Sequence, residues 1–195
     1  KISSIVIDPK NPQTVYIATM DGARVYKLFT DDGILYLSTY AGEGLHGNSV
    51  YCVTIDPTSP NVIYAGTTNS VYKSEDSGLS WKYSSNGLTY YGSGVDVYSL
   101  AIDTSNTQIL YAGTYGKGVF KSLDGGNSWK KIGGGATAIA INPDNTEIIY
   151  TGADGIYESK DGGASWEEIG KGAIRGNISS IAIDPTNTKI IYVGT

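Results

Sequence analysis

Apolar and polar positions along this chain follow one pattern that recurs five times. Each copy has an apolar run, a short polar turn and a second apolar run, as in "SIAIDPTNTKIIYVGT" from Ser180. Short alternating runs bounded by Asp, Pro and Asn are typical of two antiparallel strands joined by a turn. The turns begin at positions spaced by 48, 47, 39 and 42 residues, namely Asp8, Asp56, Asp103, Asn142 and Asp184.

A second pattern follows four of the five copies and predicts a further hairpin in each. It reads "SVYKSEDSGLSWKYS" from Ser70, "GVFKSLDGGNSWKKI" from Gly118 and "GIYESKDGGASWEEI" from Gly155. In the first copy, "RVYKLFTDDGILYLS" from Arg24, the pattern is degenerate. One unit is therefore four short antiparallel strands in about 40 to 48 residues, which is the size of one β-propeller blade.

The repeats predict an all-β protein, a single β-propeller domain over residues 1–195. We expect four blades plus a half blade, an incomplete ring, with boundaries at about 2–48, 49–96, 97–135, 136–177 and 178–195. Proteins normally avoid exposed sheet edges. We therefore expect the open edges of this ring to be paired with another chain or with the missing part of a longer parent protein.

Composition supports the β assignment and excludes several classes of function. The chain has 26 Gly and 16 Tyr, residues suited to turns and to half-buried strands. With a net charge of −5 and no basic run, we expect no nucleic-acid partner. No apolar run is long enough for a membrane span. Cys52 is the single cysteine, so we expect no disulfide and no cysteine metal cluster. We also expect no other metal site and no cofactor. The Tyr, Thr and Asn content is typical of an extracellular or cell-surface protein.

Each second hairpin turns through the octapeptide Ser-x-Asp-x-Gly-x-Ser-Trp, as in "SLDGGNSW" from Ser122. The Asp carboxylate accepts hydrogen bonds from the turn, Gly supplies the positive φ of a tight reversal, and Trp begins the next strand with a large ring to bury. One carboxylate per turn is far fewer than the about six to eight oxygens that Ca²⁺ takes. We therefore expect a structural role for Asp31, Ser74, Asp76, Gly78, Trp81, Ser122, Asp124, Gly126, Trp129, Ser159, Asp161, Gly163 and Trp166.

The octapeptides "SEDSGLSW", "SLDGGNSW" and "SKDGGASW" match the Asp-box motif of BNR-repeat β-propellers. Together with the flanking "IDP…IIYVGT" and "GVFKS" patterns, they are most similar to the repeats of xyloglucanase-like glycoside hydrolases, sortilin-type receptors and a photosystem assembly factor. The resemblance implies four-stranded blades with Asp-box hairpins. It also implies that the boxes lie on the face away from the usual binding site. Since unrelated activities share the motif, it indicates a fold rather than a function.

The residues present allow two kinds of enzyme activity to be tested. Sialidases of this fold hold a substrate carboxylate with three arginines, and this chain has only Arg24 and Arg175, so sialidase activity is not expected. Glycoside hydrolysis needs two carboxyl groups about 5 to 9.5 Å apart. Xyloglucanase-like enzymes supply that pair from two propellers. This chain would supply at most one of the two, so an enzymatic role requires a larger protein.

A ligand is expected on the face opposite the boxes, which is formed by the loops between second and third strands and between blades. Tyr rings and carboxylates there suit a sugar, and Tyr also suits a protein partner. The candidate ligand-binding residues are Tyr40, His46, Tyr90, Tyr91, Tyr115 and Arg24. The candidate catalytic carboxylates are Asp21, Glu43, Asp96 and Asp154. The alternative is that these residues only stabilise the loops.

Three functions remain open. The leading hypothesis is a non-catalytic binding or scaffold propeller with a carbohydrate or protein ligand. The first alternative is a fragment of a xyloglucanase-like glycoside hydrolase that acts on β-glucans, and the second is a structural or assembly factor. Two carboxylates that face each other across a cleft within about 10 Å would favour the enzyme. A Tyr-rich surface without such a pair would favour binding.

Overall fold

The computed structural model of this protein describes residues 1–22, 24–31, 34–38, 43–46, 49–172, 174 and 176–195. Strands and turns make up this described part of the chain. It contains no helix long and apolar enough to cross a lipid bilayer. The all-β prediction is therefore confirmed.

Four sheets of four antiparallel strands follow one another along the chain, each with its strands in sequence order. The first two sheets contain β1 (Ile2–Ile7), β2 (Thr14–Thr19), β3 (Arg24–Asp31) and β4 (Ile34–Ser38), then β5 (Val50–Ile55), β6 (Ile63–Thr67), β7 (Ser70–Ser74) and β8 (Lys82–Tyr83). The third and fourth contain β11 (Val97–Ile102), β12 (Leu110–Thr114), β13 (Gly118–Ser122) and β14 (Lys130–Gly133), then β15 (Ala138–Ile141), β16 (Ile149–Gly152), β17 (Ile156–Ser159) and β18 (Glu167–Ile169).

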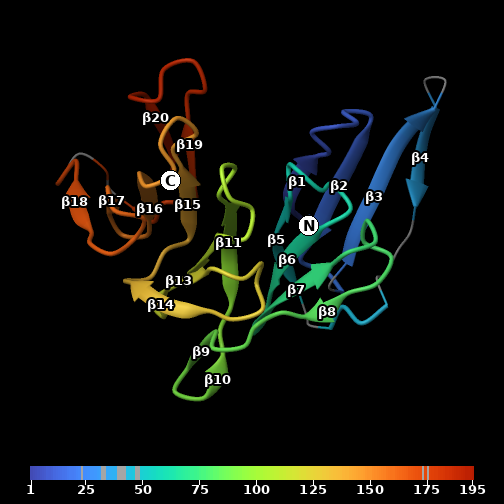
Figure 1. Ribbon diagram of the computed structural model, residues 1–195, viewed down its shortest axis with the longest axis horizontal. Coiled ribbons are helices and arrows are strands. Elements are labelled where there is room, and N and C mark those ends of the chain that lie inside the picture. Colours follow the sequence, from blue (N-terminus) through green and yellow to red (C-terminus); the bar gives the residue numbers. More distant parts are fainter. Residues whose placement is uncertain (23, 32–33, 39–42, 47–48, 173, 175) are drawn as a thin grey trace.

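Two shorter pairs complete the architecture. The pair β19 (Ser180–Ile183) and β20 (Ile191–Gly194) follows the fourth sheet. The hairpin of β9 (Thr89–Tyr90) and β10 (Ser93–Gly94) stands apart from the four sheets (Figure 1). The sequence pattern predicts only a loop here. The hairpin forms because Tyr91 and Gly92 both take positive φ (50° and 79°), the conformation that tight two-residue hairpin turns require.

The first strands of consecutive sheets lie side by side, in the order β1, β5, β11, β15, β19 (Figure 1). Serine side chains link neighbouring members of this row. Ser4 Oγ accepts a hydrogen bond from the Val53 N–H at 3.3 Å, and Ser99 Oγ accepts one from the Ile139 N–H at 3.1 Å. The later strands of each sheet extend away from the row, so adjacent sheets face each other and bury their apolar side chains between them.

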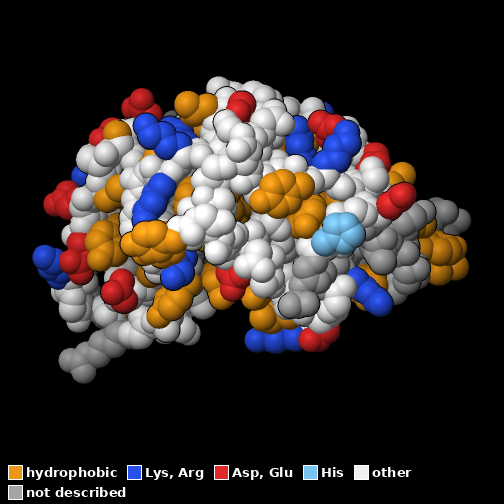
Figure 2. Space-filling view, turned by 90° about the horizontal axis from the view of Figure 1, so that it is seen from below, with side chains coloured by type: hydrophobic (Ala, Val, Ile, Leu, Met, Phe, Trp, Pro, Cys, Tyr) orange, Lys and Arg blue, Asp and Glu red, His pale blue; other side chains and the backbone are white. Residues whose placement is uncertain are grey.

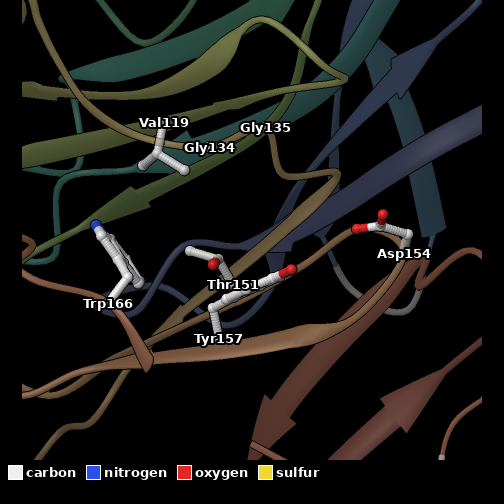
Figure 3. Close-up of a pocket in the computed structure, with 7 residues that line it drawn as sticks. All are labelled: Val119, Gly134, Gly135, Thr151, Asp154, Tyr157 and Trp166. Carbon is white, nitrogen blue, oxygen red and sulfur yellow. The ribbon is translucent and has the colours of Figure 1, made fainter. Parts of the chain in front are cut away.

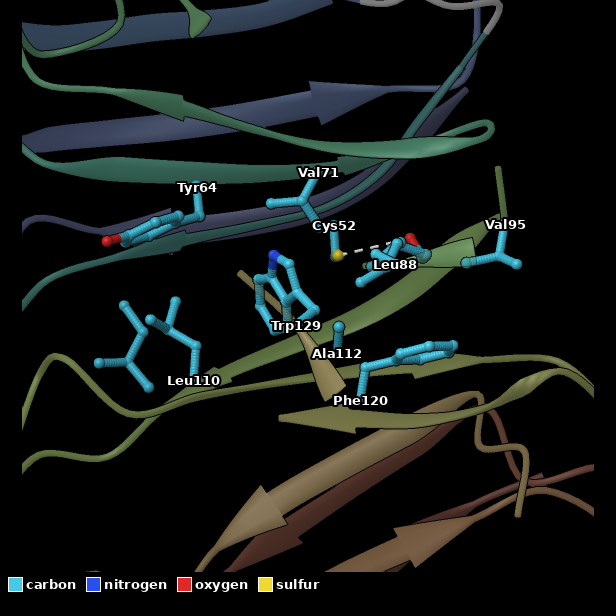
Figure 4. Packing of buried hydrophobic residues seen from close by; sticks show 11 residues of the cluster. Cys52, Tyr64, Val71, Leu88, Val95, Leu110, Ala112, Phe120 and Trp129 are labelled. Carbon is cyan, nitrogen blue, oxygen red and sulfur yellow. Dashed lines mark hydrogen bonds between the residues drawn. The ribbon is translucent and has the colours of Figure 1, made fainter. Parts of the chain in front are cut away.

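A separate apolar cluster lies between each sheet and the next. Between the second and third sheets, Trp129 lies among Cys52, Leu110 and Ala112 (Figure 4). Burial raises the pKa of the Cys52 thiol to about 12, which leaves this cysteine protonated and unreactive in the core. The sheets are thus held together by inter-sheet packing, as stacked repeat units require.

Candidate functional site

The three octapeptide turns lie between the third and fourth strands of the second, third and fourth sheets. In each turn, the Asp side chain accepts hydrogen bonds from the turn itself. In the turn from Ser122, Asp124 Oδ1 accepts hydrogen bonds from the Ser128 N–H at 2.8 Å and from Ser122 Oγ–H at 2.8 Å, and Oδ2 accepts one from Ser128 Oγ–H at 2.5 Å. The Gly126 N–H donates to Ser122 Oγ at 2.9 Å, and Gly126 has φ 86°. The carboxylate is fully occupied by its own turn.

The same hydrogen bonds recur around Asp76 and Asp161. Donation from the side chains and N–H groups of Ser80 and Ser165 lowers the pKa of each carboxyl to about 2. In the degenerate first copy, the structure describes the backbone of Asp31, which pairs with Ile34. No group of three or more His, Cys, Asp or Glu side chains that could hold a metal ion occurs among the residues the structure describes.

These turns also receive a hydrogen bond from the preceding sheet. The Tyr64 hydroxyl on β6 donates to the Gly125 carbonyl at 2.9 Å, and the Tyr111 hydroxyl on β12 donates to the Gly162 carbonyl at 3.2 Å. Both tyrosines come from the repeated Tyr-x-Gly-Thr pattern. A junction here is the contact between two consecutive sheets, and its turn end is the end with the octapeptide turn. At the junctions of the second with the third sheet and of the third with the fourth, a buried tyrosine therefore covers the turn end, a contact that the sequence did not predict.

Two adjoining cavities lie at the other end of the sheets. The larger one, about 480 Å³, is formed where the first strands begin, and it is lined by Lys1, Ile2, Ser3, Met20, Tyr51, Tyr98, Tyr115, Thr137, Asn177, Ile178 and Ser179. The smaller one, about 380 Å³, is lined by Tyr90, Ser93, Gly94, Val95, Asp96, Tyr98, Tyr115 and Lys117. Tyr98 and Tyr115 line both cavities, so the two lie side by side; together they are called the tyrosine-lined depression below.

One repeat position contributes a side chain to the larger cavity from all five copies. It is the position just before each repeated apolar run, occupied by Ser3, Tyr51, Tyr98, Thr137 and Ser179. This shared position is the signal that could have identified Tyr51 and Tyr98, which the loop-based search missed. The rings of Tyr51 and Tyr98 stack with their centroids 4.6 Å apart and their planes at 20°. They form a paired aromatic surface at the start of β5 and β11.

The smaller cavity combines aromatic rings with one carboxylate and one ammonium group. The Lys117 ammonium lies 4.6 Å from the Tyr90 ring centroid. Asp96 Oδ1 accepts a hydrogen bond from the Asn69 N–H at 3.2 Å. Burial is the main cause that raises the pKa of the Tyr98 hydroxyl, and the nearby Tyr51 and Asp96 raise it further through electrostatic repulsion. The hydroxyl therefore stays neutral. Such a surface can cover the apolar face of a sugar ring and bond its hydroxyls.

The structure brings some of the predicted residues together at this depression. Tyr90, Tyr115 and Asp96 line it. Tyr91 is 92% exposed at the tip of the β9–β10 hairpin, with its ring 4.4 Å from that of Tyr90. Asp21 lies beside Lys1, a lining residue of the larger cavity.

Other predicted residues lie elsewhere. The Glu43 carbonyl accepts a hydrogen bond from the Trp81 N–H at 2.8 Å, which places the Glu43 backbone beside the Asp76 turn. The expectation that Glu43 lies at the opposite end is therefore wrong, because this residue pairs with the octapeptide turn of the next sheet. His46 belongs to the same connection and is exposed, as the pale-blue side chain in Figure 2 shows.

Two further candidates do not join the depression, and a third cannot be placed. Arg24, the first residue of β3, donates from Nη1 to the Tyr26 hydroxyl at 3.4 Å. Asp154 lines a different cavity, between the third and fourth sheets. Tyr40 lies outside the described residues. Seen from the side of the β9–β10 hairpin, hydrophobic side chains occur in separate groups among polar atoms (Figure 2).

Comparison with solved structures identifies the architecture. The structure of an ancestral GH74 enzyme superposes with a TM-score of 0.78 over 99% of this chain and 27% of that chain, at 24% sequence identity. The extracellular domain of a one-component system from B. thetaiotaomicron gives a TM-score of 0.78 at 18% identity, over 100% of this chain and 26% of that chain. The chain has the β-propeller fold of these proteins. The prediction of a propeller is confirmed.

Sequence comparison also finds xyloglucanases among the similar proteins. Over 163 residues, the chain is 27% identical to a xyloglucanase of Hypocrea jecorina, covering 75% of this chain and 19% of the relative. It is also 27% identical over 168 residues to xyloglucanase Xgh74A of Acetivibrio thermocellus, covering 68% of this chain and 20% of the relative. No protein-family model matches the chain. The chain spans about a fifth of the length of these curated relatives, and the expected likeness to xyloglucanase-like propellers is confirmed.

Proposed function

We propose that this chain is a segment of a xyloglucanase-like glycoside hydrolase and that its tyrosine-lined depression binds a β-glucan chain. The xyloglucanase relatives and the GH74 structures support this alternative better than the leading hypothesis of a non-catalytic module. The observation that carries the proposal is that Tyr98 and Tyr115 line both of the adjoining cavities. A group of neighbouring tyrosine rings suits an extended ligand of linked sugars.

The proposal includes an assignment of the sheets to blades. The four four-stranded sheets correspond to blades at about 2–48, 49–96, 97–135 and 136–177, and β19–β20 begins a further blade within one domain over residues 1–195. The larger cavity is then the mouth of the channel around the propeller axis. Its lining by one repeat position from five copies supports this assignment. The three octapeptide turns act as structural Asp-boxes, since their carboxylates are occupied by their own hairpins.

In this proposal the segment contributes substrate binding rather than the complete chemistry. Hydrolysis of a glycosidic bond needs two carboxyl groups about 5 to 9.5 Å apart. Asp96 is the single carboxylate among the described residues that line the depression. A second carboxylate would come from outside these lining residues. A polymeric glucan does not cross membranes, so we place the protein outside the cell or on its surface.

The lone carboxylate also favours a second candidate, a propeller that binds the glucan without cleaving it. The two candidates differ in whether the depression meets a partner carboxylate in the full-length protein. Both require the tyrosine surface to bind β-glucan.

Affinity electrophoresis of the chain in gels that contain xyloglucan tests this proposal. The chain should be retarded, and Tyr98→Ala and Tyr115→Ala should each weaken retardation at least tenfold, because stacked rings carry the contact. Tyr192→Ala, which removes a 59% exposed tyrosine of β20, serves as the control and should behave like the unaltered chain. Thermal melting should show that all variants are folded. A chain that migrates freely through xyloglucan would disprove the binding role. Release of new reducing ends would disprove the claim that this segment lacks complete chemistry.

A further inference from the structure

The junction between the third and fourth sheets contains a cavity of about 320 Å³, lined by Val119, Gly134, Gly135, Thr151, Asp154, Tyr157 and Trp166 (Figure 3). It is separate from the tyrosine depression, since the two share no lining residue. Figure 3 shows Trp166 at one end and Asp154 at the other, with Thr151 and Tyr157 between them and Val119 across the space.

The repeat shows what this cavity would contain if the junction were a simple core. At the junction of the second and third sheets, the positions of Thr151, Tyr157 and Trp166 are occupied by Ala112, Phe120 and Trp129. Those three side chains pack with Leu88 and Val95 in a buried apolar cluster (Figure 4). Between the third and fourth sheets, the cavity lies beside a smaller apolar cluster that includes Val119, Ala136 and Ile149, and each of the two exchanged residues adds a hydroxyl group.

The polar groups of the cavity are available for a ligand. Neither the Thr151 hydroxyl nor the Tyr157 hydroxyl has a hydrogen-bond partner among the described residues. No buried side-chain oxygen of these residues lacks a partner, so the hydroxyl of Thr151, a residue only 3% exposed, faces the open space of the cavity. Asp154, at the solvent-exposed mouth, adds a carboxylate. A half-buried Trp166 adds the face of an indole ring. The cavity thus combines two aromatic rings with three oxygen groups that can donate or accept hydrogen bonds.

We propose that the cavity between the third and fourth sheets binds a single neutral sugar ring, a pentose or a hexose in its pyranose form. A volume of 320 Å³ lies at the small end of the range of about 300 to 1,000 Å³ for ligand pockets, which suits one ring and not an oligosaccharide. The Trp166 ring covers the apolar face of the sugar. Thr151, Tyr157 and Asp154 bond its hydroxyls. The carboxylate disfavours anions, and the free hydroxyl groups favour a polyhydroxylated ligand over an alkylammonium ion.

This site goes beyond the glucan-binding depression and does not depend on it. Gly134 offers a direct way to close the cavity, because a Cβ built there meets no atom within 4 Å and the residue does not have positive φ. Gly134→Phe is therefore expected to fold and to fill the cavity. Gly134→Ala adds only a methyl group at the same position and is the matched control.

The test is titration of the ¹⁵N-labelled chain with D-glucose, D-xylose and tetramethylammonium chloride, followed through the indole N–H signals of its three tryptophans. At least one of the two sugars should shift the Trp166 signal and leave those of the buried Trp81 and Trp129 in place. Gly134→Ala should retain the effect. Gly134→Phe should weaken it at least tenfold, and Asp154→Asn should weaken it several-fold.

Three results would overturn the proposal. They are the absence of a Trp166 shift with both sugars, the persistence of the shift in Gly134→Phe, and stronger binding of tetramethylammonium than of either sugar. Tyr98→Ala should bind the monosaccharide normally, and Gly134→Phe should still be retarded by xyloglucan. A failure of this site and a failure of the proposed function are therefore distinguishable.

Discussion

The junction between the second and third sheets and the junction between the third and fourth are built from the same repeat positions but are filled differently. In the first, residues 84–96 connect the sheets and send Leu88 and Val95 into the core. In the second, the connection is residues 134–137, with Gly134 and Gly135 facing the space. Ala136 of this connection still packs into an apolar cluster with Val119 and Ile149. The length and side chains of the connection therefore decide whether a junction also contains a cavity beside its core.

The largest difference between the two junctions is expected in the stability lost when Trp129 or Trp166 is replaced by alanine. Trp129 is 5% exposed and donates from its indole N–H to the Ser84 carbonyl at 2.8 Å. Trp129→Ala should lower the free energy of unfolding by about 3–5 kcal/mol. Trp166 is half-buried beside a cavity, so Trp166→Ala should cost roughly half as much. Urea denaturation of both variants measures this, and equal losses would contradict the comparison.

Substitutions in the two connections should act in opposite directions. Leu88 is fully buried, and Leu88→Ala should destabilise the chain by about 2–5 kcal/mol by leaving a cavity. Gly134→Leu places apolar atoms in a cavity that already exists, and it should be neutral or stabilise the chain by about 0.5–1 kcal/mol. Thermal unfolding followed by circular dichroism tests the pair. A large loss of stability in Gly134→Leu would show that the cavity is already well packed.

At the turn end, the two junctions should respond alike. Tyr64→Phe removes the hydroxyl donor of the Gly125 carbonyl and should cost about 0.5–1.5 kcal/mol. Tyr111→Phe should cost somewhat less, because Lys121 Nζ also donates to the Gly162 carbonyl, at 2.8 Å. Chemical denaturation of the two variants measures the difference. No loss in either variant would show that these contacts do not join the sheets.

The smallest effect is expected from acid, and it should be common to the octapeptide turns of the second and fourth sheets. The carboxyl groups of Asp76 and Asp161 have their pKa lowered to about 2, below the unfolded value of about 3.9. Their stabilising contribution is therefore complete above pH about 4 and is lost as the pH falls through about 2. Solvent screening keeps the effect small, because both groups are exposed to water.

Melting temperatures at acid pH measure this contribution. Asp76→Asn and Asp161→Asn should each melt below the unaltered chain at neutral pH and approach it near pH 2. The Asp184→Asn variant, in a turn outside the octapeptides, is a useful comparison because its carboxyl also has a lowered pKa. A difference that stays constant from neutral to acid pH would exclude ionisation as the source of the stability.

Much of the architecture could be predicted from the sequence. The repeated apolar runs placed all five first strands, and the octapeptides placed three hairpins, because local alternation and turn chemistry specify strands and reversals. The candidate sites were predicted less well. Tyr90, Asp96 and Tyr115 meet at one depression, but Glu43 lies at the other end and Asp154 lines a different cavity. Non-repeating loops carry no periodic signal that gives their direction.

The sequence by itself determined the strand order, the hairpin turns and the repeat that stacks sheet on sheet. Only the tertiary structure decided which side chains share a cavity. Tyr51 and Tyr98 lie 47 positions apart and stack because the sheets place equivalent positions side by side around one point. Thr151 and Trp166 border open space because the connection before their sheet is short. Local pattern specifies elements, whereas the packing between distant elements, set by side-chain volume and connection length, creates the sites.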